Sequence, residues 1–458
     1  MLDSDLESEL FLLSFVPRLV LAFFTIIIAI LVYKLSCILY NNKSFAIVSL
    51  TIFALIPAMW PFRNFLLDPI MVIFVLLSLF VLVRKPFYGK TVRNTGNMQV
   101  ANTTYNILVL ILSGSLFGIA LLVKLSAIFF LPIVLLFATG HSLNWVYHLR
   151  TGSNKNYEFE NNIAKVKTSQ RIIHGSVWLM PIIAAVLSWI VFLAQSGSFE
   201  YFVSTQLWQL SRVSSSPFES LFLLFVTSPV GLVIGLVGLG KIIHDKNQRI
   251  WSLLAIPYFG FLFRGGYVSF VHAIPLLPIL SIFTGKIGYL LASKFLQILI
   301  PKSKQNEKTL HKLKVCFLLA ILVVSGGITI WISSFDDTKT SRETIRYIVN
   351  EIPENAVLVT DAGYSWMIKE FRSDIKLLDF YSLNVLDKTP DEFYIAEKPN
   401  LLKFDQSLKQ TQYLYDKSCL ITTFQNNPSN LGFYHPYSSI SERWWDVEVR
   451  YFNIKGCE

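Results

Sequence analysis

Long runs of apolar residues recur along the first 334 residues, and they limit the fold more than any other feature of the sequence. A helix that crosses the hydrocarbon core of a bilayer needs roughly 17 to 25 predominantly apolar residues. These runs predict an α-helical polytopic membrane protein with about ten transmembrane helices. They occupy residues 14–39, 45–60, 65–83, 107–123, 127–138, 177–193, 221–239, 251–263, 271–291 and 315–332.

Composition and charge support a membrane protein and divide the chain. With 53% hydrophobic and 15% charged residues, a single water-soluble globule would have too little polar surface. The net charge of +10 does not indicate nucleic-acid binding, because the basic residues lie in short loops between apolar runs. Residues 1–334 hold 26 Lys and Arg against 11 Asp and Glu, whereas residues 335–458 hold 14 against 19. We therefore predict a short acidic N-terminal arm (1–13), a multi-spanning domain (14–334) and a separate domain (335–458).

The last of these domains is predicted to be a small α/β domain. Its sequence favours helices over residues 343–352 and 364–371 and strands over residues 357–360, 376–380 and 419–423.

The distribution of basic residues predicts the orientation in the plasma membrane. Alternate loops, at residues 41–44, 84–106, 140–175, 241–250 and 294–314, together hold 19 Lys and Arg, and each of the four opposite loops holds one. Because basic loops stay in the cytoplasm, Met1 and the C-terminal domain are expected to be extracytoplasmic. Cys419 and Cys457 would then lie in an oxidising compartment, where a disulfide between them is an open alternative. The acidic start and long first run do not fit a cleavable signal peptide.

Asp68 is the one carboxylate of the membrane part that lies inside an apolar run, where an ionised group is costly. This position makes Asp68 a candidate catalytic residue, and the candidate ligand if a divalent cation takes part. The alternative is structural, because Asp followed by Pro69 is a common helix start. Both roles remain open at this point.

One basic residue in each external loop, together with Arg18 near the outer end of the first run, forms a second pattern. Each could be a side chain that reaches the lipid headgroups. Together they would suit a lipid-linked phosphate at the outer leaflet, since guanidinium and ammonium groups bind phosphoryl oxygens. The loop residues are Arg63, Lys124, Arg212 and Arg264.

The loop at residues 195–218 carries aromatic and amide side chains that suit a sugar or a headgroup, although interfacial aromatics also anchor membrane proteins. The candidate sugar or acceptor contacts are Tyr201, Trp208, Gln209 and Arg212. His272, at the start of the ninth run, could donate a hydrogen bond to the phosphate or be merely solvated.

Four segments resemble the polytopic GT-C glycosyltransferases that use polyprenyl-phosphate-linked sugars, such as protein O-mannosyltransferases and the lipid A aminoarabinose transferase. The resemblance covers about residues 15–350. The segments are VPRL at 16–19, RNFLLDPIMVIF at 63–74, GSLFGIALLVKLSAIFFLPIVL at 114–135 and HAIPLLP at 272–278.

The resemblance implies site roles and a reaction. Asp68 corresponds to the acidic residue of the family's second external loop, and Arg18 and Lys124 correspond to basic positions near the donor site. Residues 345–458 correspond to the family's extracytoplasmic α/β domain. Family members attack the anomeric carbon with an acceptor hydroxyl or amide and displace polyprenyl phosphate with inversion.

One departure from the family concerns the N-terminus. Relatives place another span and a large external loop, bearing the main acidic residue, before the span equivalent to 14–39. We expect that function to come from a segment upstream of Met1, from a partner, or from the acidic arm. The arm carries Asp3, Asp5, Glu7 and Glu9.

The expected function is a membrane glycosyltransferase that moves a sugar from a polyprenyl-phosphate donor to a protein, glycan or lipid acceptor on the extracytoplasmic face. No cofactor is required by the sequence, and a divalent cation is the one candidate. A flippase for lipid-linked saccharide and a non-catalytic scaffold are the alternatives. A flippase predicts paired halves with polar groups at mid-membrane, and no such repeat stands out.

Overall fold

The computed structural model divides the chain into two compact units, Leu21–Thr329 and Met1–Val20 with Ile330–Glu458. We describe each unit by itself. The structure describes residues 2–54, 67–84, 97–139, 168–200, 202–203, 206, 218, 221–222, 224–225, 228–245, 248–263, 272, 274–299, 339–360, 362–379, 389–397, 409–425 and 446–454.

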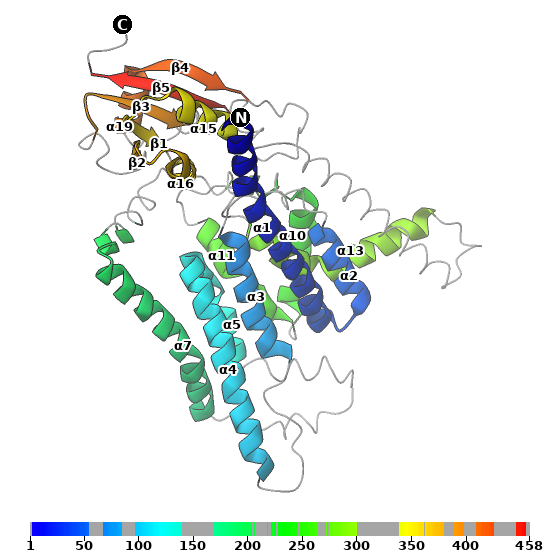
Figure 1. The fold of residues 1–458 in the computed structure, drawn as a ribbon. Helices are drawn as coiled ribbons and strands as arrows, with labels where there is room; N and C mark the ends of the chain where they lie inside the picture. The colour runs from blue at the N-terminus through cyan, green and yellow to red at the C-terminus, as the bar shows by residue number, and fades with distance from the viewer. Residues whose placement is uncertain are drawn as a thin grey trace. The chain divides into compact units, whose positions relative to one another are not determined.

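The described part of the membrane unit is built from helices, and each predicted apolar run other than 315–332 contains one (Figure 1). The run at 315–332 lies outside the described residues. The helices are α1 (Leu2–Tyr40), α2 (Lys43–Ala54), α3 (Asp68–Arg84), α4 (Asn97–Val123), η3 (Leu125–Phe130), α5 (Leu131–Ala138), α7 (Thr168–Gln195), α10 (Pro229–His244), η4 (Arg249–Leu254), α11 (Ile256–Leu262) and α13 (Leu276–Leu299).

Three stretches of described helix are long and apolar enough to cross a bilayer, namely Leu19–Tyr40, Thr168–Gln195 and Leu276–Lys294. Shorter apolar helices accompany them, so the predicted count of about ten spans remains a prediction. The first helix begins at Leu2, well before the predicted span at residue 14. Acidic residues are favourable near a helix N-terminus, which explains how the acidic arm can be helical although it is not apolar.

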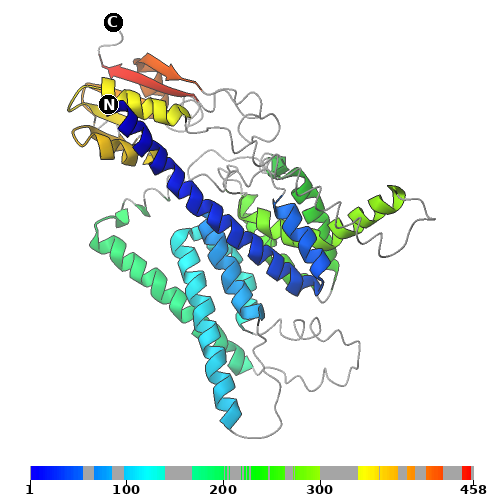
Figure 2. The same ribbon diagram turned by 45° about the vertical axis from the view of Figure 1, so that its right-hand side comes forward.

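Helix α4 packs between α3 and α7 through small residues and a buried polar cluster (Figures 1 and 2). The Ser78 and Ser113 hydroxyl oxygens lie 2.8 Å apart, and Trp178 Nε1 donates to Ser113 Oγ at 3.1 Å. A Cβ on Gly114 would overlap the backbone carbonyl of Trp178. Small residues let helix backbones approach closely in a bilayer, where the hydrophobic effect does not drive helices together.

A second group of helices, α2, α10 and α13, packs in the same way. Gly238 of α10 lies against the Phe283 backbone, and Gly285 of α13 lies against Ser49 of α2. Tyr40 also donates its hydroxyl hydrogen to the Phe283 carbonyl at 2.9 Å. Close backbone contact and side-chain-to-backbone hydrogen bonds therefore stabilise both helix groups.

The C-terminal unit contains a five-stranded mixed sheet with strand order β2-β1-β3-β5-β4. Strand β1 pairs in parallel with β2 and β3, whereas β5 pairs antiparallel with β3 and β4. The elements are α15 (Lys339–Glu351), β1 (Val357–Thr360), α16 (Ala362–Phe371), β2 (Lys376–Asp379), β3 (Glu392–Glu397), α19 (Lys409–Lys417), β4 (Ser418–Phe424) and β5 (Val447–Asn453).

Helices cover both faces of this sheet. On one face, apolar residues of α15 and α16, such as Ile348 and Ile368, pack on Leu358 and Val449. Figure 2 shows α15 lying along the strands. On the other face, Leu414 of α19 packs within a second apolar cluster that includes Phe393, Ile395 and Phe452. The predicted α/β domain is therefore present as a layered helix–sheet–helix structure.

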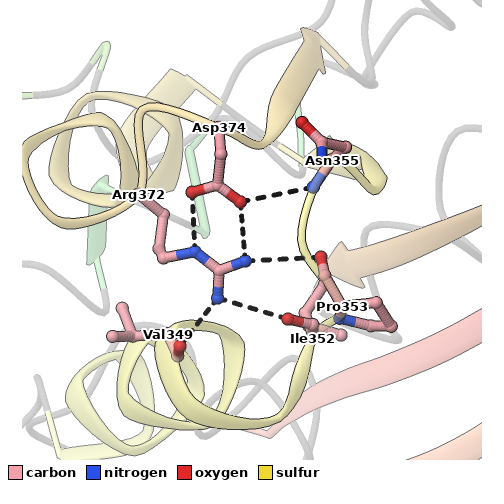
Figure 3. Close-up of polar contacts among 6 residues, drawn as sticks. All are labelled: Val349, Ile352, Pro353, Asn355, Arg372 and Asp374. Atoms are coloured by element: carbon pink, nitrogen blue, oxygen red, sulfur yellow. Dashed lines mark hydrogen bonds and ion pairs between the residues drawn. The ribbon is translucent and has the colours of Figure 1, made fainter.

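Arg372 joins the end of α15 to the turn before β2 (Figure 3). Its Nη1 donates to the carbonyl oxygens of Val349 at 2.8 Å and Ile352 at 3.2 Å. Its Nε and Nη2 each lie 2.8 Å from a carboxylate oxygen of Asp374. Hydrogen bonding by Arg372 lowers the pKa of Asp374 well below its ordinary value. A cation at the C-terminus of a helix satisfies carbonyl groups that lack intrahelical partners.

The sequence did not predict β3, α19 or β5, and charged residues explain the omission of β5. Arg450 and Glu448 alternate with valines in β5, which obscures its apolar character. In the structure both are buried, with Arg450 Nη1 2.7 Å from Glu448 Oε2 and Arg450 Nε 2.8 Å from Ser418 Oγ. A buried charge is tolerated where a partner and hydrogen bonds satisfy it.

Candidate functional site

The candidate site begins where α3 begins. Asp68 is the first residue of α3 and Pro69 follows it, as the sequence predicts for a helix start. The Met71 amide donates to the Leu67 carbonyl at 2.9 Å, which closes the first turn. The Asp68 side chain is only 1% exposed. The start of α3 therefore holds a buried carboxylate.

Lys124 occupies a one-residue break between two helices. Helix α4 ends at Val123, Lys124 has an extended backbone with φ −159° and ψ 125°, and η3 starts at Leu125. The Lys124 amide donates to the Ala120 carbonyl at 3.0 Å, and the Lys124 carbonyl accepts from the Ala127 amide at 3.0 Å. The backbone amide and carbonyl of Lys124 are thus both hydrogen-bonded, and these bonds leave the lysine side chain unconstrained.

The two side chains form a bidentate ion pair. Lys124 Nζ lies 2.7 Å from both Asp68 Oδ1 and Asp68 Oδ2. The lysine side chain is 28% exposed, whereas the aspartate beneath it is 1% exposed. Short charge-assisted hydrogen bonds compensate part of the cost of removing both charges from water. Both carboxylate oxygens have a partner beyond the helix, so Asp68 does more than cap α3.

This arrangement suits acid–base and phosphate chemistry. An ionised carboxylate can take up a proton or coordinate a metal ion, and an ammonium group binds phosphoryl oxygens. Among the described residues, no group of three or more His, Cys, Asp or Glu side chains is placed to hold a metal ion.

The other predicted site residues are placed less completely. The His272 ring is half-buried, with its centroid 6.0 Å from that of Phe261. Arg18 lies on α1, but its side chain is outside what the structure describes. The remaining candidates lie outside the described residues, so their convergence on Asp68 remains a prediction. They are Arg63, Tyr201, Trp208, Gln209, Arg212 and Arg264.

Ser126 is a residue near the break that the sequence did not single out. Its hydroxyl oxygen is buried and has no hydrogen-bond partner within the described part of the chain. Its apolar context, LSAIFF, gives no signal that separates it from a packing residue.

A comparison with protein families gives a match within the first half of the chain. Residues 12–201 match the model of the dolichyl-phosphate-mannose-protein mannosyltransferase family. The matched segment includes both Asp68 and Lys124. A comparison with curated protein sequences gives no match.

Similar solved structures come from an archaeon and a bacterium. The oligosaccharyltransferase of Archaeoglobus fulgidus in the apo form is 10% identical, with a TM-score of 0.52 over 90% of this chain and 62% of that chain. The oligosaccharyltransferase AglB of the same archaeon, in complex with an inhibitory peptide and a dolichol-phosphate, is 11% identical, with a TM-score of 0.50 over 91% of this chain and 62% of that chain. ArnT from Cupriavidus metallidurans bound to undecaprenyl phosphate is 13% identical, with a TM-score of 0.48 over 95% and 83%.

At these identities the archaeal structures indicate a shared fold, and this chain spans less than two thirds of their length. Fold and family model agree with the resemblance to GT-C glycosyltransferases that the sequence motifs indicated, and that prediction is confirmed. They also agree with a multi-pass membrane protein.

Proposed function

We propose that this chain, whose membrane part has the GT-C fold, transfers a sugar from a polyprenyl-phosphate donor to a protein, glycan or lipid acceptor on the extracytoplasmic face. The observation that carries the proposal is the Asp68–Lys124 pair at the start of α3. The pair lies inside the segment that matches the mannosyltransferase model. A carboxylate and a cation side by side are the two groups that this transfer requires.

Each group has one role in the proposed reaction. Asp68 orients the acceptor and takes its proton while the acceptor attacks the anomeric carbon. The bond between that carbon and the phosphate oxygen breaks, and Lys124 offsets the charge that grows on the departing phosphate. If a divalent cation takes part, Asp68 is its ligand in this proposal.

Other predicted residues complete the proposed donor and acceptor sites. We assign Arg18, Arg63 and Arg264 to the donor phosphate, with His272 assisting. The loop residues suit the sugar or the acceptor, because aromatic and amide groups stack on and hydrogen-bond to such ligands. They are Tyr201, Trp208, Gln209 and Arg212.

The proposed ligands agree with those named for a protein of the same fold. The AglB structure holds an inhibitory peptide and a dolichol-phosphate. A lipid phosphate and a peptide are therefore the first donor and acceptor classes to test.

Two observations support an extracytoplasmic site and C-terminal unit. Basic residues concentrate in alternate loops, as positive-inside orientation requires. Cys419 is disulfide-bonded in the structure, and structural disulfides persist mainly outside the cytoplasm. Since Cys37 is free, the partner of Cys419 lies outside the described residues, and Cys457 remains the predicted one.

Sugar transfer by the full-length chain in proteoliposomes tests the proposal. The assay uses a radiolabelled polyprenyl-phosphate sugar with a peptide, a glycan or a lipid as acceptor. We expect Asp68→Asn to lower the rate by about 10²- to 10⁴-fold. We expect Lys124→Met to lower it by about 10²- to 10³-fold.

Matched variants and a chelator complete the design. Glu343→Gln removes a charge from a side chain that is 39% exposed, and Lys294→Met removes one from an exposed position. Both variants should transfer sugar at the wild-type rate. Wild-type rates in both site variants would contradict the enzyme proposal and favour a scaffold. Loss of transfer in EDTA, with recovery on adding Mg²⁺ or Mn²⁺, would show that a cation takes part.

A further inference from the structure

The closed ion pair hides the carboxylate that the proposed reaction needs. Asp68 is 1% exposed and both of its oxygens accept from Lys124 Nζ. Lys124 is the more exposed member of the pair, at 28%. An incoming ligand therefore meets the ammonium group first, and an acceptor cannot reach Asp68 until Lys124 has moved.

Of the two side chains, Lys124 is the one that can move. The Asp68 carboxylate sits on a short side chain at the first turn of α3, next to Pro69, whose ring fixes the backbone. The lysine ammonium sits at the end of a flexible four-carbon stem. Hydrogen bonds hold its backbone on both sides, so the side chain can turn without disturbing α4 or η3.

Charge also opposes simultaneous binding of a phosphate to the closed pair. The pair is neutral as it stands, because one ammonium group compensates one carboxylate. A phosphate that approached Lys124 in this state would lie within a few ångströms of an ionised carboxylate, and like charges at that distance repel. Binding becomes favourable when the ammonium group leaves Asp68 and faces the phosphate.

We propose that the Asp68–Lys124 pair is a latch that the donor phosphate opens, so that the donor must bind before the acceptor can reach Asp68. This inference rests on the proposed function and adds a binding order to it. A donor that has opened the latch leaves the carboxylate oxygens available to the acceptor. Without the donor, the carboxylate stays covered.

Binding of undecaprenyl phosphate to the purified full-length chain tests the latch. If the latch exists, removing the competing carboxylate increases the affinity for this lipid. If the open state of the latch is populated about one tenth of the time, the apparent affinity for the lipid is about tenfold weaker than the affinity of the open state. We expect Asp68→Asn to bind undecaprenyl phosphate about tenfold more tightly than wild type, although its sugar transfer is lower. Lys124→Met should bind the lipid more weakly than wild type.

Controls separate the latch from general electrostatics. Glu343→Gln removes a carboxylate of the C-terminal unit that is not part of the pair, and should bind the lipid as wild type does. Unchanged or weaker binding by Asp68→Asn would overturn the latch and would mean that the carboxylate only positions Lys124. Failure of both wild type and Asp68→Asn to bind undecaprenyl phosphate would count against the proposed function itself.

A second measurement uses the wild-type chain and does not depend on how the variant folds. Carbodiimide with an added amine modifies accessible carboxylates, and mass spectrometry reports the modified fraction at Asp68. We expect that fraction to rise when undecaprenyl phosphate is added, and to stay unchanged at Glu343. An unchanged or lower fraction at Asp68 with the lipid bound would overturn the latch.

Discussion

Asp68 and Lys124 lie 56 positions apart in the sequence and meet because α3 and α4 are consecutive helices packed against each other. When two neighbouring helices run in opposite directions, the start of the first lies beside the end of the second. The sequence predicts both residues at the same membrane face, since each flanks an external loop. Their bidentate geometry could not be predicted, because it depends on the single extended residue that interrupts the helix.

Asp374 provides a test of electrostatics at the residue scale. Hydrogen bonding by Arg372 lowers the pKa of Asp374, so the folded state binds that proton less readily than the unfolded state. The stabilisation is therefore complete above the unfolded pKa of about 4 and is lost as the pH falls below it. We expect Asp374→Asn to lower the Tm of the full-length chain at pH 7, and to lower it less at pH 3.

Asp416→Asn is the matched control, since it removes an exposed carboxylate from α19. Its effect on Tm should be small at both pH values. An Asp374→Asn effect that is equal at pH 7 and pH 3 would show that the carboxylate charge does not stabilise the turn.

At the scale of the element, the sequence predicted structure well where apolar runs or regular patterns are strong. Strand β1 lies at the predicted residues 357–360, α16 contains the helix predicted over 364–371, and α15 contains the helix predicted over 343–352 except for its last residue. Strand β3 was not predicted because only four apolar residues stand between its terminal glutamates, and helix α19 was not predicted because most of its residues are polar or charged. Strand β5 was not predicted because Glu448 and Arg450 are buried and paired with each other only once the sheet has assembled.

The contact between α4 and α7 gives a prediction about an element. A methyl group on Gly114 would overlap the Trp178 backbone carbonyl, which cannot turn away as a side chain can. We expect Gly114→Ala to destabilise the folded chain by about 1 to 3 kcal/mol. The Tm of the detergent-solubilised full-length chain measures the loss.

Gly240 offers a control of the same chemistry. A Cβ at this position of α10 has no neighbour within 4 Å among the described residues. Gly240→Ala should therefore leave Tm unchanged or raise it slightly, since alanine favours helix over glycine. Equal losses in the two variants would show that the close α4–α7 contact is not responsible.

At the scale of the whole molecule, the sequence correctly indicated a mainly helical chain with long apolar helices and a C-terminal sheet domain. The number of spans and the orientation remain predictions, because they depend on the bilayer and on loops outside the described residues. The same holds for the site. Its one ion pair is formed by the first residue of α3 and the residue that follows α4, both described, whereas most of the other predicted contact residues lie in loops outside the described residues.

Orientation can be tested directly in cells. A C-terminal alkaline phosphatase fusion should be active, because that enzyme requires an oxidising compartment for its disulfides. A fluorescent protein that folds only in the cytoplasm should be dark at the same position. The opposite pattern would contradict both the charge-based orientation and an extracytoplasmic site.

The junction at Lys124 also has a consequence for evolution. Each residue of an α-helix advances the chain by about 1.5 Å and turns it by about 100°. A residue inserted between Val123 and Lys124 would rotate the ammonium group away from Asp68, and a deletion between Val123 and Leu125 would remove the lysine itself. Either change would leave the apolar pattern almost intact. Genes of relatives that keep this pair should therefore show no length variation at the junction, even where their loops differ freely.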